Sequence, residues 1–175
     1  AQLPVDAGSE VTVEINPDDV DDDFVEALRA LGATRVSLGV QSFHDDALTF
    51  LGRRHDVAGA RRAIERLLRA NVGALCLDLI FGWPGQGEAQ WRHDLEAALD
   101  YAPSHLSAYQ LTVEPGTPLA RLGEKGAFRP QDETSLGGLY MAGSRFLRER
   151  GWDHYEVSNY ARTPKDRAHH NAKYW

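Results

Sequence analysis

The stretch 35–41 alternates branched apolar residues with small or polar ones, a pattern that predicts a β-strand. One face carries Val36, Leu38 and Val40, and the other face carries Ser37, Gly39 and Gln41. The second face has little bulk, so it suits the wall of a cavity better than a filled core. Asp45 and Asp46 follow at the expected start of a helix, where carboxylates complement the helix dipole.

Two further stretches, 11–15 and 75–80, divide in the same way into an apolar and a polar face. Their polar positions are Thr12, Glu14, Cys76 and Asp78. A fourth strand is predicted at 105–113 and a last extended piece at 154–157. Residues 158–175 are rich in His, Asn and aromatic residues, and we expect them to be irregular.

Apolar residues at helical spacing predict a helix after each of the four strands, around 24–31, 57–68, 91–99 and 136–147. Asp56 is expected to cap the second of these helices, and Gly32 to end the first. The acidic run 18–23 is interpreted as the N-terminus of the first helix. A calcium loop is the weaker interpretation, because the ligand spacing and the closing Glu of an EF-hand are missing.

Strand and helix therefore alternate four times, the pattern of an α/β protein built from parallel βα units. We expect residues 1–175 to belong to one domain, with a tail region from about residue 158. A doubly wound sheet would bury both faces of its strands, whereas here each strand has one polar face. The division favours a barrel or partial barrel, with a wide lumen that holds a polar ligand.

Composition and charge exclude several classes of partner. The net charge of -7 and the dispersed basic residues give no footprint for nucleic acid. No run of about 18 apolar residues and no basic-then-apolar leader is visible, so the cytosol is the default compartment. The lone Cys76 cannot form an intrachain disulfide and is interpreted as a small core residue.

The working residues of a barrel lie at the carboxyl ends of its strands. We expect Glu14, Gln41, Asp78 and the segment 112–114 at that rim, with Arg53 in the loop after the second strand. Each residue alone has an ordinary structural explanation as an ion-pair partner or a cap. Together they suit a ligand with hydroxyls, an amine and a carboxylate.

Ordered motifs extend this pattern to a known family. They are TVEINP, RVSLGVQSF, LGRRH, LDLIFGWPGQ, LSAYQLTVEPGTPL, GWDHYEVSNYA and HHNAKYW. The combination resembles radical S-adenosylmethionine proteins related to anaerobic coproporphyrinogen III oxidase, especially their heme chaperone branch. The resemblance covers residues 11–175 and implies a partial (β/α) barrel of the TIM type, with a [4Fe–4S] cluster and S-adenosylmethionine at the strand ends.

The resemblance also implies roles for single residues. Glu14 matches the family's ligand of the adenosyl ribose, and Gln41, Arg53 and Asp78 match positions that line the S-adenosylmethionine region. Thr112 matches another such position by strand register only. The tail residues His170, Asn171, Tyr174 and Trp175 match the signature of the heme chaperone branch, so we expect them to contact heme.

The chain departs from the family in its cysteines. The family holds its cluster with C-x3-C-x2-C, but this sequence has one cysteine and no glycine-rich segment of the expected kind. We therefore expect no metal ligand set within the chain, missing strands upstream, a missing region downstream, and no activity of the chain alone. A zinc site from His154, His169 and His170 is a weak alternative, because no known zinc spacing supports it.

Three functions follow from these observations. The favoured one is a heme chaperone that binds heme or a porphyrin and delivers it to an acceptor protein. The alternative is an oxidoreductase of the coproporphyrinogen III oxidase type, which decarboxylates propionates oxidatively through a 5′-deoxyadenosyl radical. A lyase with a Lys Schiff base is weakest, because no expected strand end carries a Lys.

Overall fold

Six strands form one sheet in the computed structural model, which describes residues 8–169 and 171. The strands lie in the order β1-β2-β3-β4-β6-β5. They are β1 (Thr12–Ile15), β2 (Arg35–Gln41), β3 (Ala74–Phe81), β4 (His105–Gln110), β5 (Asp153–Glu156) and β6 (Asn159–Ala161). Strands β1 to β4 are parallel, whereas β6 runs antiparallel to both β4 and β5. The predicted α/β fold with parallel units is confirmed, with an antiparallel hairpin added at one edge.

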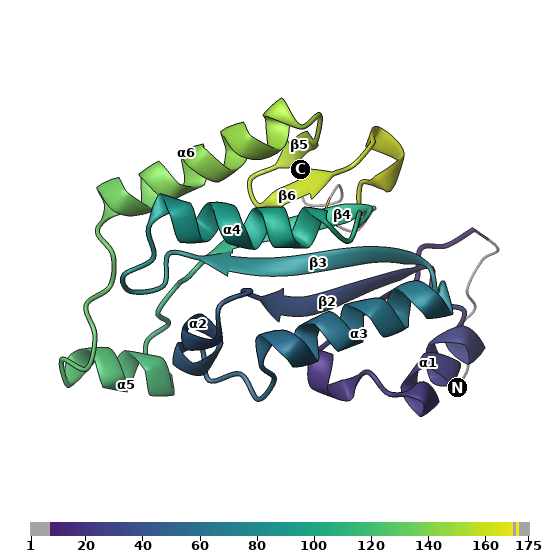
Figure 1. Ribbon diagram of the computed structural model, residues 1–175, viewed down its shortest axis with the longest axis horizontal. Helices are drawn as coiled ribbons and strands as arrows, with labels where there is room; N and C mark the ends of the chain where they lie inside the picture. The colour runs from purple at the N-terminus through teal and green to yellow at the C-terminus, as the bar shows by residue number, and fades with distance from the viewer. Residues whose placement is uncertain (1–7, 170, 172–175) are drawn as a thin grey trace.

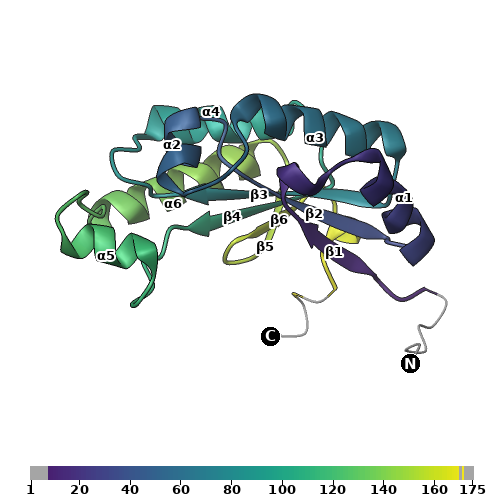
Figure 2. The same cartoon turned by 90° about the horizontal axis from the view of Figure 1, so that it is seen from below.

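Helices cover one face of this sheet (Figures 1 and 2). The described helices are α1 (Asp22–Leu31), α2 (Asp45–Phe50), α3 (Val57–Ala70), α4 (Glu88–Leu99), α5 (Pro118–Glu124) and α6 (Glu133–Glu149), with short 3-10 turns η1 (Pro17–Asp19) and η2 (Pro164–Asp166). In Figure 2, α3 and α4 lie side by side over the sheet, and α6 continues their layer. The opposite face carries no helix among the described residues, so its polar side chains face an open hollow.

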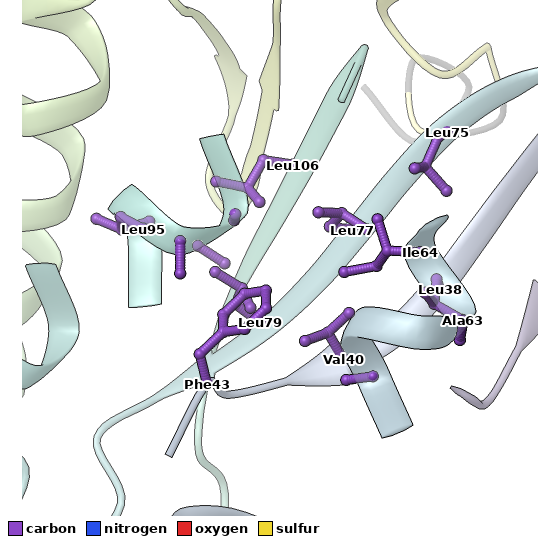
Figure 3. Packing of buried hydrophobic residues seen from close by; sticks show 14 of the residues in the cluster. Leu38, Val40, Phe43, Ala63, Ile64, Leu75, Leu77, Leu79, Leu95 and Leu106 are labelled. Carbon is purple, nitrogen blue, oxygen red and sulfur yellow. The ribbon is translucent and has the colours of Figure 1, made fainter. Parts of the chain in front are cut away.

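The hydrophobic core lies between the sheet and this helical layer (Figure 3). Leu38, Leu77 and Leu79 point toward the helices, where they meet Ile64 of α3 and Leu95 of α4. All five side chains have 0% exposure. Burial of each such side chain contributes about 1.5–3 kcal/mol. The predicted apolar faces of the strands therefore do hold the sheet and helices together.

The expected helix ends are also confirmed. Asp21 accepts a hydrogen bond from the backbone N–H of Phe24, so the acidic run does begin α1. Asp56 caps α3 through the N–H of Gly59. Gly32 ends α1 in the left-handed conformation, with φ of 70°, which costs glycine little because it has no Cβ.

Three predictions about elements are wrong. Strand β4 ends at Gln110 and not at residue 113, so Thr112 lies in the following loop. Helix α5 forms after that loop, because Thr117 caps it through the N–H of Ala120 and Pro118 occupies its first turn. Strand β6 forms within the segment expected to be irregular, because its backbone pairs with both β4 and β5.

Candidate ligand-binding lumen

A cavity of about 250 Å³ lies on the open face of the sheet. Its walls are Thr12, Glu14, Arg35, Ser37, Cys76, Asp78, His105, Ser107, Tyr109, Ala168 and Asn171. Polar alternation on four parallel strands produces this wall, because every second residue faces the same side. The register places Glu14 level with Ser37, Ser37 with Cys76, and Cys76 with His105. The structure thus brings the predicted Glu14 and Asp78 to one lumen.

Asp78 is held by its neighbour on β2. The Ser37 hydroxyl donates a hydrogen bond to Asp78 Oδ2 across 2.8 Å. Asp78 pairs in register with Ser107 and lies in the middle of β3, three residues before the strand ends at Phe81. Asp78 therefore lines the cavity together with Glu14 from a position before the end of β3.

Gln41 ends β2 in an uncommon conformation. Its φ is 69°, in the left-handed region, which costs a residue with a Cβ roughly 1–2 kcal/mol. The register with β3 shifts between Leu38 and Gln41, so the side chain returns toward Gly39. A Cβ on Gly39 would lie 2.6 Å from Gln41 Nε2, so glycine is needed for this close approach. Gln41 is buried at the end of β2, and it is not among the residues that line the cavity.

Arg53 and Thr112, like Gln41, lie outside the set of residues that line the cavity. Arg53 Nη1 donates to Asn16 Oδ1 at 3.4 Å, which links the loops that follow β1 and β2. Its Nε is buried and has no hydrogen-bond partner in the described part of the chain. Thr112 is exposed, two residues after β4 ends. The predicted set is therefore only partly brought together.

Tyr155 of β5 joins three residues that line the lumen, namely His105, Ala168 and Asn171. Its hydroxyl accepts hydrogen bonds from the backbone N–H of Ala168 and from Asn171 Nδ2, both at 3.2 Å. The hydroxyl hydrogen is then available for His105 Nε2 at 2.8 Å, so this nitrogen accepts and the proton of a neutral ring is on Nδ1. Tyr155 thereby ties the tail to β4.

Arg35 of β2 also holds the chain around residues 166–167 near the lumen. It is buried, and its guanidinium donates to Glu10 Oε2 at 3.0 Å and to Cys76 Sγ at 3.1 Å. It also donates to the backbone oxygens of Asp166 and Arg167. Five donors in a rigid fork allow one arginine to join the first and last described segments of the chain.

Five lumen residues were missed by the sequence reasoning, namely Arg35, His105, Ser107, Tyr109 and Ala168. Arg35 lies two positions before Ser37, so the alternation of β2 could have placed it on the polar face. His105, Ser107 and Tyr109 alternate with the buried Leu106 and Ala108 in the same way. Tyr155 gave no such signal, because its role depends on the position of the tail.

The Cys76 thiol is buried within this wall. Burial raises its pKa to about 11, although the neighbouring Arg35 acts in the opposite direction. Thiolates are the ligands of iron–sulfur clusters. A single, buried and protonated thiol does not fit such a cluster.

A larger cavity of about 480 Å³ lies between η1 and α3. Two of its four arginines, Arg54 and Arg66, are paired with acidic neighbours. Arg54 Nε lies 3.6 Å from Asp18, and Arg66 Nε lies 3.2 Å from Asp22. Such exposed pairs contribute about 0–1 kcal/mol, and we interpret this groove as a solvated surface of compensating charges.

The tail is described only in part. Asn171 lies against the lumen, whereas His170, Tyr174 and Trp175 lie outside the described residues. His169 is exposed, and its backbone N–H donates to Glu10. His154 stacks on Tyr160 with ring centroids 4.2 Å apart.

No described helix is both long enough and apolar enough to cross a bilayer.

The sequence is similar to curated proteins along nearly its whole length. It is 39% identical to the heme chaperone HemW of Escherichia coli K12, over 100% of this chain and 45% of that protein. It is 34% identical to the heme chaperone HemW of Synechocystis, over 99% of this chain and 42% of that protein. A bovine relative, the mitochondrial radical S-adenosyl methionine domain-containing protein 1, is 37% identical over 100% of this chain and 39% of its own length. The chain thus spans less than half the length of these relatives.

The fold is similar to that of coproporphyrinogen III oxidase (HemN) from Escherichia coli, described as a radical SAM enzyme. The TM-score is 0.74 at 20% identity, over 88% of this chain and 35% of that one. The archaeal Elp3 of Methanocaldococcus infernus gives a TM-score of 0.67 at 27% identity, over 77% of this chain and 32% of that one. The expected partial barrel of the TIM type is confirmed by the first likeness.

The family model of the radical SAM superfamily matches residues 2–98, which is more than half of the chain. The family implies S-adenosylmethionine and a [4Fe–4S] cluster as cofactors. The Glu14 and Asp78 carboxylates on the lumen face fit the polar groups of the first. The lone buried Cys76 does not fit the second. By its sequence and its fold, the chain belongs to the radical SAM superfamily.

Proposed function

We propose that the protein to which this chain belongs is a heme chaperone, which binds heme on a radical SAM scaffold and passes it to an acceptor protein. The observation that carries the proposal is the similarity to heme chaperones of two distant bacteria. It extends over 99–100% of this chain at 34–39% identity. The similarity includes the lumen strands and continues into the tail.

S-adenosylmethionine would bind in the lumen. Glu14 and Asp78 supply carboxylates for the ribose hydroxyls or the ammonium group, and Gln41 supplies an amide at the end of β2. Arg53 would take the carboxylate of the ligand, because its Nε has no partner among the described residues. Thr112 is the least supported member of the set, since it is exposed beyond the end of β4.

Heme would bind at the tail through His170, Asn171, Tyr174 and Trp175. An imidazole suits the iron, and the large aromatic side chains suit the flat apolar ring. Asn171 is anchored to the lumen by Tyr155, which supports a connection between the heme region and the S-adenosylmethionine region.

The cluster would be bound by cysteines outside residues 1–175. One cysteine within the chain and a span of less than half of the relatives' length support this arrangement. Residues 1–175 would then be the central to C-terminal part of one barrel domain. The chain alone would be inactive in any reaction that needs the cluster.

The oxidase alternative has less support. The likeness to coproporphyrinogen III oxidase is at 20% identity and shows the fold alone. Radical chemistry coupled to heme transfer would make the protein an oxidoreductase, and we do not assign that activity.

A heme titration of the whole protein tests the proposal. On addition of heme, the absorbance change at the Soret band should saturate in the wild type, and most of this change should be lost in His170→Ala. The affinity for S-adenosylmethionine, measured by calorimetry, should be the same in both. His169→Ala is the matched control, because it removes a neighbouring imidazole. Equal heme affinity of the wild type and His170→Ala would show that His170 is not the heme ligand. No saturable binding by the wild type, together with consumption of coproporphyrinogen III, would establish the oxidase instead.

A further inference from the structure

A second group of ligand-type side chains lies away from the lumen, where the loop after β2 meets α4. It contains His44, His93 and Asp94, and one donor atom of each lies within 4.8 Å of the other two. His44 Nε2 is 3.9 Å from Asp94 Oδ1, and the rings of His44 and His93 are 4.7 Å apart. Sequence spacing gave no sign of this cluster, because α2, α3 and β3 separate its two halves.

Asp94 is the fixed member of the cluster. Its side chain has 0% exposure. The Ser42 hydroxyl donates to it at 3.0 Å, the backbone N–H of Phe43 donates at 2.5 Å, and Gln86 Nε2 lies 3.5 Å away. These hydrogen bonds hold the carboxylate in place and leave room at Oδ2, whose donors are the rotatable Ser42 hydroxyl and the distant Gln86 amide.

Few basic side chains lie near the Asp94 carboxylate. Its hydrogen-bond donors are neutral groups, and within the described residues His44 is the one basic side chain that lies within ion-pair distance. A bound cation would therefore offset the cost of burying this carboxylate.

The two imidazoles can complete a coordination sphere. His93 is exposed and makes no hydrogen bond within the described part of the chain, so its ring is able to rotate. The side chain of His44 is 24% exposed, and its Nε2 lies 3.2 Å from the backbone oxygen of Gln90, a contact that the metal would replace. Tetrahedral zinc places its ligand atoms roughly 3.3 Å apart, and one donor atom of each of the three side chains already lies within 4.8 Å of the other two, so modest movements of the rings would bring them to one ion.

We propose that His44, His93 and Asp94 bind a divalent transition-metal ion of the zinc class, with a fourth position open to water. Two imidazoles and one carboxylate are a ligand set that zinc accepts. Asp94 already holds the turn at Ser42 and Phe43, directly after Gln41. The metal fixes this turn against α4, and it is independent of the proposed heme function.

Zinc and cobalt titrations of the 175-residue chain test the site after treatment with a chelator. One equivalent of Zn²⁺ should bind in calorimetry and raise the melting temperature, because the ion binds the folded chain. Co²⁺ should give the intense visible absorption of a tetrahedral site. His93→Gln should weaken zinc binding at least tenfold and remove the cobalt absorption, whereas His169→Gln should behave like the wild type.

The choice of His93 keeps the test independent of folding, because its side chain is exposed and is not used by the core. A melting curve without metal should be the same for wild type and His93→Gln. Absence of saturable zinc binding in the wild type would overturn the proposal. Equal zinc affinity in wild type and His93→Gln would overturn it as well.

Discussion

Ser37 and Asp78 are joined by a hydrogen bond of 2.8 Å that crosses from β2 to β3 on the open face of the sheet. The serine hydroxyl donates, so it orients the carboxylate without neutralising it. A negative charge fixed in this way can receive the hydroxyls or the ammonium group of a ligand with little further ordering. The pair is therefore the clearest point at which to test the lumen.

Asp78→Asn should weaken S-adenosylmethionine binding to the whole protein by about 1.5–3 kcal/mol, the range for hydrogen bonds to charged groups. Calorimetry on the protein with its cluster assembled measures this change. Ser37→Ala is the companion variant and should have a smaller effect, since it removes the orienting group and keeps the charge. Unchanged affinity in Asp78→Asn would show that the ligand does not use this carboxylate.

Gly39→Ala should lower S-adenosylmethionine affinity by about tenfold while changing the free energy of unfolding by less than about 1 kcal/mol. The new Cβ would meet Gln41 Nε2 at 2.6 Å and displace the amide, but the nearest backbone atom, Ile15 O, lies at 3.5 Å, an ordinary contact distance. Calorimetry and thermal unfolding separate the two effects. A large loss of stability would mean that the strand, and not the amide, requires glycine.

Two glycines of α6 should respond to alanine with opposite signs. Gly138 is exposed and no atom lies within 4 Å of an added Cβ, so Gly138→Ala should stabilise the fold by about 0.5–1 kcal/mol. A Cβ on Gly143 would collide with the Trp91 indole of α4, so Gly143→Ala should cost about 1–3 kcal/mol. Chemical denaturation of the two variants measures both changes. Stabilisation by Gly143→Ala would contradict the close packing of α6 on α4.

The Cys76 thiol should make stability fall at alkaline pH. Its pKa is about 11 in the folded chain against 9.0 for an unperturbed thiol, so the folded state keeps a proton that the unfolded state has lost. The stabilising effect is complete below pH 9 and is lost as the pH rises to about 11, and two pKa units correspond to about 3 kcal/mol.

The slope of unfolding free energy against pH in this range should be less steep in Cys76→Ala than in the wild type. Comparing slopes removes the contribution of groups that both proteins share, such as Tyr155, whose pKa is also raised by burial. Labelling of the wild-type thiol with iodoacetamide should be slow when folded and fast in denaturant. Equal slopes, or rapid labelling of the folded chain, would contradict the burial of Cys76.

Alternation within single strands allowed the lumen to be predicted from the sequence, because small or polar residues alternate with branched apolar residues along β2 and along the middle of β3. The same reasoning placed Glu14 and Asp78 on one surface correctly. It left the exact end of β3 open, since that end depends on pairing with β4, which continues to Phe81 and Gln110. Strand ends of this kind are set by neighbours and not by the local pattern.

The contacts of Arg35 and Tyr155 beside the lumen could not be predicted, because they join segments that are distant in the sequence. Arg35 reaches the backbone of Asp166 and Arg167, more than 100 residues away. The β5–β6 hairpin has strands of four and three residues, too short for a periodic signal. Pairing of β6 with β4 stabilises the hairpin and places Tyr155 beside His105.

Tyr155→Phe should loosen the tail from the lumen. The variant removes the hydroxyl that accepts from the N–H of Ala168 and from Asn171 Nδ2 and that bonds His105 Nε2. Unsatisfied buried partners cost about 1–3 kcal/mol, so the free energy of unfolding should fall by that amount. Amide hydrogen exchange should accelerate in residues 166–169, while exchange in β2 and β3 stays protected.

Tyr140→Phe is the matched control, because the Tyr140 hydroxyl makes no hydrogen bond within residues 8–169 and 171. It should unfold and exchange like the wild type. In the whole protein, Tyr155→Phe should also weaken heme binding, since Asn171 begins the proposed heme-contacting segment and loses its anchor. Loss of tail protection with unchanged heme affinity would separate the two roles and show that heme binding does not depend on this hydrogen bond. Exchange identical to that of the wild type would show that the hydroxyl does not hold the tail.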